Sequence, residues 1–310
     1  MRKNIVKLMT IFVLLGSVFG GFTGQVAAQE KINVVTTTTH LTDLVEDIGG
    51  ERVEVTGLMG PGVDPHGYNP SPSDIEALTS ADMIGHNGLN LEAMFTDVFE
   101  AMESAGSNIF ALEEVVSEDD VLEYEYEGKE LENDPHIWFD IDIWKNAAQL
   151  VADELTAVDE EGADYYQTNL DEYITQLDEL DAYIKERVEE VPEESRYLIT
   201  AHDAFGYFGA RYGFEVVGIQ GLNSQTEAGT GDIAAVADLV VENNIKAAYI
   251  ESSVPDRNMQ ALVEAVEADG GTLEIGGVLF SDALGTDEEN AGNYFDAYRT
   301  NIDTIVDGLK

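Results

Sequence analysis

The sequence predicts an α/β fold of two lobes, each built on a parallel sheet, with one long rigid helix joining them. Short runs rich in β-branched residues alternate with amphipathic segments over residues 31–111, and the alternation starts again at residue 197. Such alternation is typical of a parallel sheet covered by helices. Between the two series, one amphipathic segment spans residues 163–191 and would form a helix about 40 Å long. Because one small domain does not require so long a helix, we interpret it as a connector between two lobes.

The first lobe begins with the segment KINVVTTTT at residues 31–39, whose β-branched residues predict a buried strand. A helix is expected next, with Leu41, Leu44, Val45 and Ile48 on its apolar face. Further strands are predicted at 53–58, 82–86 and 107–111, and further helices at 73–79 and 91–104. Ser71 or Ser73 is expected to cap the helix at 73–79.

Two helices then follow an acidic stretch at residues 117–134. The first is predicted at 142–158 and the second at 163–191. Seven apolar residues of the second keep helical spacing, namely Leu170, Tyr173, Ile174, Leu177, Leu180, Ile184 and Val188. Pro192 cannot continue a helix, so the connector is expected to end before it.

The second lobe repeats the strand and helix pattern up to the C-terminus. Strands are predicted at 197–201, 215–219, 246–251 and 272–279, and helices at 205–212, 233–243, 259–269 and 290–309. We therefore divide the chain into a signal peptide at 1–28, an N-terminal α/β lobe at 29–160, the connecting helix at 161–191 and a C-terminal α/β lobe at 192–310. Ligands of open α/β sheets bind beyond the strand ends, which here face the cleft between the lobes.

The first 28 residues have the pattern of a secretory signal peptide. Arg2, Lys3 and Lys7 precede an apolar stretch at 8–22, and small residues follow at Ala27 and Ala28. We expect cleavage after Ala28 and a periplasmic or extracytoplasmic location. A lipoprotein signal needs a cysteine at the cleavage point, and the sequence contains no cysteine. The sequence therefore predicts a protein that is not lipid-anchored, and it leaves imidazole and carboxylate as the available metal ligands.

The charge of the chain excludes several classes of partner. The formal net charge is -47 at pH 7, which repels nucleic acid and anionic lipid surfaces. Disorder is the first alternative for so acidic a chain, but 44% of its residues are hydrophobic and they fall in periodic runs. We interpret the charge as an adaptation of the surface to high salt, where counterions screen the repulsion.

Three of the five histidines lie in unusual local sequences near predicted strand ends. They are His66 in DPHGYNPSPSD, His136 in NDPHIWFDID and His202 in LITAHDAFGYF. A proline before each of the first two restricts the backbone, which lowers the entropy lost on forming a rigid ligand set. Each of these histidines alone could be a hydrogen-bonded core or turn residue. We expect no metal role for the other two, His40, which could cap a helix or line the cleft, and His86, which ends a strand. The three together indicate a metal site.

These segments, with YIESSVPDRNMQAL at 249–262 and GGVLFSDALG at 276–285, resemble the zinc- and manganese-binding receptors of ABC importers over essentially the whole mature chain. The resemblance implies a metal between two lobes, held by His66 and His136 from the first and by His202 and Asp282 from the second. It also implies that the protein is not an enzyme but a monomeric receptor that delivers one metal ion per chain to a membrane permease and its ATPase.

Three imidazoles and one carboxylate suit tetrahedral Zn²⁺, whereas Mn²⁺ prefers more oxygen ligands. Manganese-selective members of the family often have a glutamate at the third position, where this sequence has His202, and this difference favours zinc. The stretch at 117–134 holds nine carboxylates and no histidine, unlike the histidine-rich loop of zinc-specialised relatives. We therefore expect Zn²⁺ or Mn²⁺, with zinc favoured.

Other functions have weaker support. A secreted zinc-dependent hydrolase would need an open coordination position, and the sequence lacks H-E-x-x-H. A metal-binding surface adhesin on the same fold would be expected to show repeats or an anchor. Gly229, Gly231 and Ala234 have the spacing of a dinucleotide fingerprint but follow a polar loop instead of a strand. Glu251, at a predicted strand end, is a candidate to orient an imidazole.

Overall fold

The computed structural model describes residues 31–124, 132–226 and 228–310. The predicted signal peptide and residues 125–131 of the acidic stretch lie outside the described residues. Residues Lys31–Lys310 form one compact unit. In the described part of the chain, no helix is both long and apolar enough to cross a membrane.

The first lobe contains a four-stranded parallel sheet in the order β2-β1-β3-β4. Its strands are β1 (Ile32–Thr36), β2 (Val53–Gly57), β3 (Met83–His86) and β4 (Ile109–Ala111). The helices of this lobe are α1 (Thr39–Gly49), α2 (Pro72–Ser80), α3 (Thr96–Ala105) and α4 (Ile141–Val158). Ser71 caps α2 through a capping box with Asp74, as one of the two predicted alternatives has it.

The second lobe contains another four-stranded parallel sheet in the order β10-β9-β7-β8. Its strands are β7 (Tyr197–His202), β8 (Glu215–Gln220), β9 (Ala247–Glu251) and β10 (Glu274–Leu279). The helices are α6 (Gly206–Tyr212), α7 (Thr230–Asn243), α8 (Arg257–Ala268) and α9 (Tyr294–Leu309). A small antiparallel pair, β5 (Glu123–Tyr124) and β6 (Glu132–Asn133), lies before α4.

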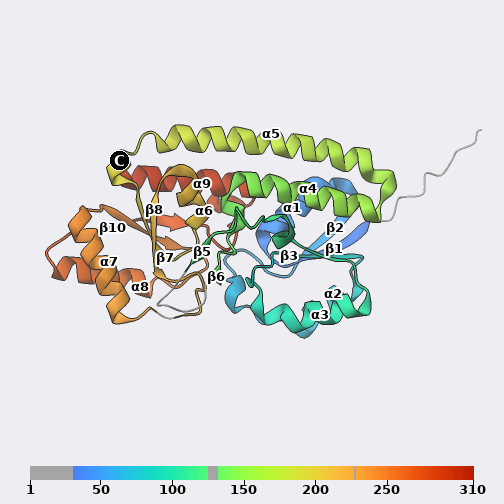
Figure 1. Ribbon diagram of the computed structural model, residues 1–310, viewed down its shortest axis with the longest axis horizontal. Coiled ribbons are helices and arrows are strands. Elements are labelled where there is room, and N and C mark those ends of the chain that lie inside the picture. The colour runs from blue at the N-terminus through green and yellow to red at the C-terminus, as the bar shows by residue number, and fades with distance from the viewer. Residues whose placement is uncertain (1–30, 125–131, 227) are drawn as a thin grey trace, which may run out of the picture. The chain divides into compact units, whose positions relative to one another are not determined.

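The connector is helix α5 (Ala163–Val188), which runs past both lobes along one side, with α4 and α9 beneath it (Figure 1). Its inner stripe is fully buried at Tyr166, Leu170, Tyr173, Leu177, Leu180 and Ile184. The predicted fold class of two α/β lobes with parallel sheets and one long helix is confirmed.

One hydrophobic core continues from the first lobe into the second under α5. The short 3₁₀ helix Ile137–Phe139 of the first lobe is part of this core. The Trp138 indole donates to the Ser281 carbonyl at 3.0 Å, and the hydroxyls of Tyr294 and Tyr298 donate to the carbonyls of Trp138 and Phe139 at 2.6 and 2.7 Å. The lobes are therefore packed against each other through buried contacts as well as through the connecting helix.

Candidate metal centre

Four side chains of the candidate site come from loops and strand ends on both sides of the cleft. His66 lies in a 3₁₀ turn (Pro65–Gly67) after β2, and His136 directly precedes the 3₁₀ helix Ile137–Phe139. His202 is the last residue of β7, and Asp282 follows β10 by three residues. The carboxyl ends of parallel strands thus direct both contributions of the second lobe into the cleft.

The structure brings these four side chains together, so that one ligand atom of each lies within 4.8 Å of the others. The Nε2 atoms of His66 and His136 are 3.3 Å apart. Asp282 Oδ1 lies 3.4 Å from His136 Nε2, and Asp282 Oδ2 lies 3.2 Å from His202 Nε2 and 3.8 Å from His66 Nε2. All three imidazoles therefore present the same nitrogen to one point.

These four residues are almost completely shielded from solvent. Their exposed fractions are 6% for His66, 0% for His136 and His202, and 1% for Asp282. Among the described residues, His202 Nε2 and both carboxylate oxygens of Asp282 have no hydrogen-bond partner. Buried polar atoms normally find a partner. Unpaired atoms that converge on one point fit a cation between them.

Two buried carboxylates stand behind the imidazoles. Asp134 Oδ1 lies 2.6 Å from His136 Nδ1, and Glu251 Oε2 lies 2.6 Å from His202 Nδ1. The first of these contacts is a hydrogen bond, and the second places a carboxylate at the same distance. A carboxylate in this position can hold the proton on Nδ1 and leave the Nε2 lone pair directed at the point where the four side chains meet. Glu251 was a candidate for this role from its place at a strand end. Asp134 was missed, although D-P-H occurs at both 64–66 and 134–136.

The repeated D-P-H segments have the same local geometry. Asp64 Oδ1 accepts from the backbone N–H of His66 at 2.9 Å, and Asp134 Oδ1 accepts from that of His136 at 2.9 Å. Each aspartate thus fixes the turn that presents the histidine two residues later. The repeat was the sequence signal that could have identified both aspartates.

The electrostatics of the site combine burial with opposite charges. Burial lowers the pKa of His66 to about 3. Burial acts in the same direction on His202, but the charges of Asp282 and Glu251 outweigh it and hold the pKa of His202 well above its ordinary value. Burial favours neutral Asp282, yet the histidines around it, His202 foremost, hold the pKa of that carboxyl well below its usual range. The site therefore holds an ionised carboxylate beside its imidazoles.

The remaining histidines stay outside the four-residue set. The His40 ring is buried and stacks on Trp138 with ring centroids 4.7 Å apart, and burial lowers the pKa of His40 to about 3. His86 stacks on Phe99 at 4.2 Å. The segment with dinucleotide-like spacing starts α7, and a loop separates it from the end of β8.

Two α/β lobes around three buried imidazoles and one carboxylate define a protein that binds a divalent transition metal. Residues 34–308 match the family described as zinc-uptake complex component A, periplasmic (ZnuA), and the chain belongs to this family.

Individual relatives agree with the match. The chain is 38% identical over 312 residues to the manganese-binding lipoprotein MntA of Bacillus subtilis (strain 168), covering 100% of both chains. It is 41% identical over 283 residues to the zinc-binding protein TroA of Treponema pallidum (strain Nichols), covering 91% of this chain and 90% of TroA. The solved structure of periplasmic TroA from Treponema pallidum matches with a TM-score of 0.86 and 40% identity, over 90% of this chain and 99% of that one.

These comparisons correct one prediction. The sequence predicted a protein in the periplasm that is not lipid-anchored, but the Bacillus relative, matched over its full length, is named a lipoprotein. The prediction rested only on the absence of cysteine from the sequence, and residues 1–30, which hold the predicted cleavage point, lie outside the described part of the chain. The prediction is therefore wrong, and the absence of cysteine does not exclude an anchor.

Proposed function

We propose that this protein is the receptor of a metal ABC importer, and that His66, His136, His202 and Asp282 bind one Zn²⁺ or Mn²⁺ ion for delivery to the membrane permease and its ATPase. The observation that carries the proposal is the spacing of the donor atoms. Ligands placed about 2.1 Å from a tetrahedral zinc ion lie about 3.4 Å from one another. The His66–His136 separation and the three distances from the Asp282 oxygens to the imidazoles range from 3.2 Å to 3.8 Å, and one ligand atom of each of the four residues lies within 4.8 Å of the others.

Four protein donors in this arrangement support a binding protein over a hydrolase. A catalytic zinc site keeps one coordination position for water, whereas four side chains complete a tetrahedral shell. The names of the relatives are those of metal-binding proteins. The site therefore favours capture of the ion over chemistry on a substrate.

Zinc is the metal that we expect to bind more tightly. Three nitrogen donors suit zinc better than manganese, and zinc lies above manganese in the general order of divalent affinities. The Bacillus relative is named for manganese and TroA for zinc, so the family accommodates both metals. We infer that this protein binds both, with the higher affinity for Zn²⁺.

The test titrates the metal-free protein separately with Zn²⁺ and with Mn²⁺ in high salt. Calorimetry measures the affinity, and elemental analysis measures the number of ions bound per chain. We expect one ion per chain and a loss of at least about 100-fold in zinc affinity for His202→Ala and for Asp282→Ala, since each removes one of four ligands. His86→Ala is the matched control, because His86 packs on Phe99 away from the four ligands. Unchanged titrations for both ligand variants would contradict the proposed site.

Several further assignments belong to the proposal without depending on the metal site. We infer that residues 1–28 are a signal peptide, that lobes at 29–160 and 192–310 flank the connector at 161–191, and that the acidic surface is an adaptation to high salt. We also infer that the protein is a monomer, since a net charge of -47 opposes self-association. N-terminal sequencing of the mature protein and sedimentation in high and low salt test the cleavage site and the monomer.

A further inference from the structure

A cavity of about 410 Å³ opens beside the candidate metal centre, and His66 lines it. Asn90, Glu113 and Asn133 contribute to its wall from the first lobe, and Leu222 and Asn223 from the second. The cavity therefore lies at the boundary of the two lobes and reaches His66, the most exposed of the four proposed ligands.

Burial of the other ligands limits how a cation can reach them. His136, His202 and Asp282 are at most 1% exposed, while His66 is 6% exposed. Behind His136 and His202, on the side away from the proposed ion, lie the carboxylates of Asp134 and Glu251. Each is 2.6 Å from the Nδ1 atom of its imidazole. Of the four residues only His66 lines the cavity, so an ion that approaches from the cavity meets His66 first.

The wall of the cavity has the chemistry of a site for a hydrated cation. Three asparagines can offer amide oxygens, and Glu113 offers a carboxylate. Oxygen ligands of this kind bind hard or hydrated divalent ions, and such ions can keep part of their bound water. The imidazoles behind the cavity are softer ligands that suit the dehydrated transition metal.

One part of the cavity wall is held in a fixed conformation. Gly88, Leu89 and Asn90 have φ angles of 80°, 51° and 62°, in the left-handed region that residues other than glycine seldom adopt. Glu113 Oε2 accepts from the backbone N–H of Leu89 at 2.5 Å. Glu113 therefore holds this strained turn in one conformation at the cavity wall.

We propose that this cavity is the entrance to the metal centre, where Asn90, Glu113, Asn133 and Asn223 hold the hydrated divalent ion before His66 and the other ligands replace its water. The inference rests on the proposed function, because it assigns a route to the same ion. It predicts that the wall of the cavity governs the rates of metal binding and release, whereas the four ligands govern the affinity. A barrier that lies on the only route to a site slows both directions by the same factor and leaves Kd unchanged.

The experiment uses Asn133→Trp, which places a large ring in the cavity. Asn133 is exposed, and no hydrogen bond of its side chain is described. Thr272→Trp is the matched control, since Thr272 is an exposed polar residue that lines a cavity of about 730 Å³ in the second lobe that none of the four ligands lines. Leu222→Ala is the converse variant, because it widens the same entrance. Stopped-flow mixing of each purified protein with Zn²⁺ and a chromophoric zinc indicator gives the association rate, and chelator competition gives the dissociation rate.

We expect Asn133→Trp to slow association and dissociation together by about tenfold with Kd within twofold, and Leu222→Ala to accelerate both. Thr272→Trp is expected to leave both rates unchanged. Wild-type rates in both Asn133→Trp and Leu222→Ala would overturn the entrance, as would a weakened Kd at an unchanged association rate. If the wild-type protein itself takes up no zinc, the proposed function fails; if it binds zinc and the rates ignore both variants, only the entrance fails.

Discussion

Glu251 and Asp134 lie where a carboxylate can select the imidazole nitrogen that faces the proposed metal position. Each is buried, and each lies 2.6 Å from the Nδ1 atom of its histidine. Glu251 also accepts from the backbone N–H of His202 through its other oxygen at 2.9 Å. One carboxylate thus fixes both the strand end and the ring of the same ligand, so its loss should loosen the metal without removing a ligand.

Glu251→Gln is expected to weaken zinc binding by about 10-fold to 100-fold, the range typical of groups that orient a metal ligand. The amide can keep the bond to the His202 backbone, but its NH₂ group can donate to Nδ1 and so place the ring proton on Nε2, which faces the metal. Calorimetry with a competing chelator measures the affinity, and nitrogen NMR of the metal-free protein identifies the tautomer. Glu264→Gln, at an exposed position of α8, is the control. An unchanged affinity with an unchanged tautomer would contradict the role.

The residues of the site differed in how far sequence alone could identify them. His66, His136 and His202 could be identified from the sequence because histidine is rare in this chain and these three lie near predicted strand ends. Asp282 is one of 62 acidic residues, so only the family resemblance singled it out. The two aspartates of the D-P-H segments act through side chains that meet their partners only once the turns have formed.

At the scale of elements, helix α9 begins on a carboxylate from the other lobe. Asp43 of α1 accepts from the backbone N–H of Tyr294, the first residue of α9, at 2.9 Å. The positive end of the helix dipole favours a negative charge there. Burial nevertheless raises the pKa of Asp43 to about 7, and the nearby carboxylates of Asp47, Glu46 and Asp296 act in the same direction. Ionising Asp43 in this buried position therefore lowers the free energy of unfolding at neutral pH and above.

Asp43→Asn is expected to raise the free energy of unfolding at pH 8 by roughly 2 kcal/mol, and to change it little at pH 4. In the unfolded chain this carboxyl titrates near 3.8, whereas in the folded protein it titrates at about 7. Between these values the folded state holds a proton that the unfolded state lacks, so wild-type stability falls as pH rises through this window. The asparagine oxygen can still accept from Tyr294.

Urea unfolding of the metal-free protein across pH 4 to 8 measures the effect of Asp43→Asn. Glu264→Gln again serves as control, because it removes one exposed carboxylate that, among the described residues, does not accept from the N-terminus of another helix. Parallel stability profiles of the Asp43→Asn variant and the wild type over this pH range would contradict the assignment.

Most elements were predictable because their apolar residues keep a regular period, and the departures have local causes. The first strand was predicted to reach residue 39 but ends at Thr36, since Thr38 caps α1 by accepting from Leu41 N–H. The third helix was predicted from residue 91 but starts at Thr96. Glu92, just before it, turns its side chain back to the backbone N–H groups of residues 87 and 88. Side-chain bonds of this kind compete with the periodic pattern.

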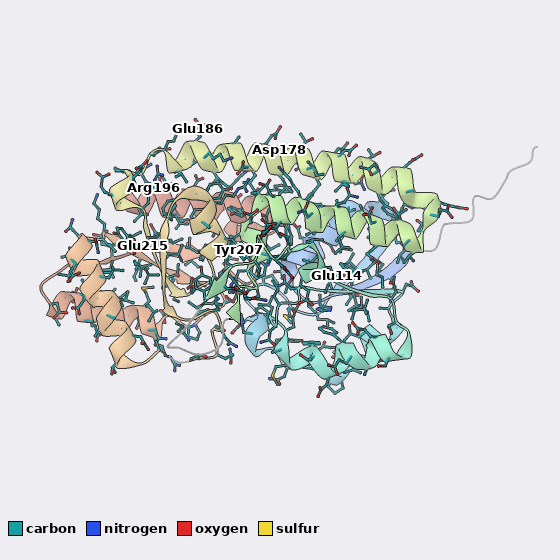
Figure 2. All side chains as sticks on the ribbon, viewed as in Figure 1. Glu114, Asp178, Glu186, Arg196, Tyr207 and Glu215 are labelled. Carbon is teal, nitrogen blue, oxygen red and sulfur yellow. The ribbon has the colours of Figure 1, made fainter. Side chains whose placement is uncertain are left out.

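At the scale of the whole molecule, the charge is carried on the outside. Glu186 points away from the body on the outer face of α5, and Glu215 lies at the start of β8 (Figure 2). The described cations are largely committed to local partners, for example Arg187 to Asp303 and Asp307 and Arg211 to Asp142 and Asp181. The net charge of -47 is therefore unbalanced over most of the surface, and repulsion opposes the compact state.

Raising NaCl from 0.05 M to 2 M is expected to raise the Tm of the metal-free protein by at least about 5 °C, because salt shortens the range of repulsion between surface carboxylates. Differential scanning calorimetry over a salt series measures the shift. Sucrose at matched osmolality is the control, since it favours the compact state without screening charge. A Tm that is independent of NaCl would contradict the repulsion argument.

The contacts that hold the segment beside His136 also govern when the binding centre can form during synthesis. Trp138 and Phe139 are fixed by Ser281, Tyr294 and Tyr298, which follow them in the chain by 143 to 159 residues. Pairings of such long sequence separation form late in folding. A nascent chain that lacks α9 already contains all four proposed ligand residues, but it lacks Tyr294 and Tyr298, which hold the segment beside His136. The receptor thus becomes able to retain its ion only after the last helix has been made and packed.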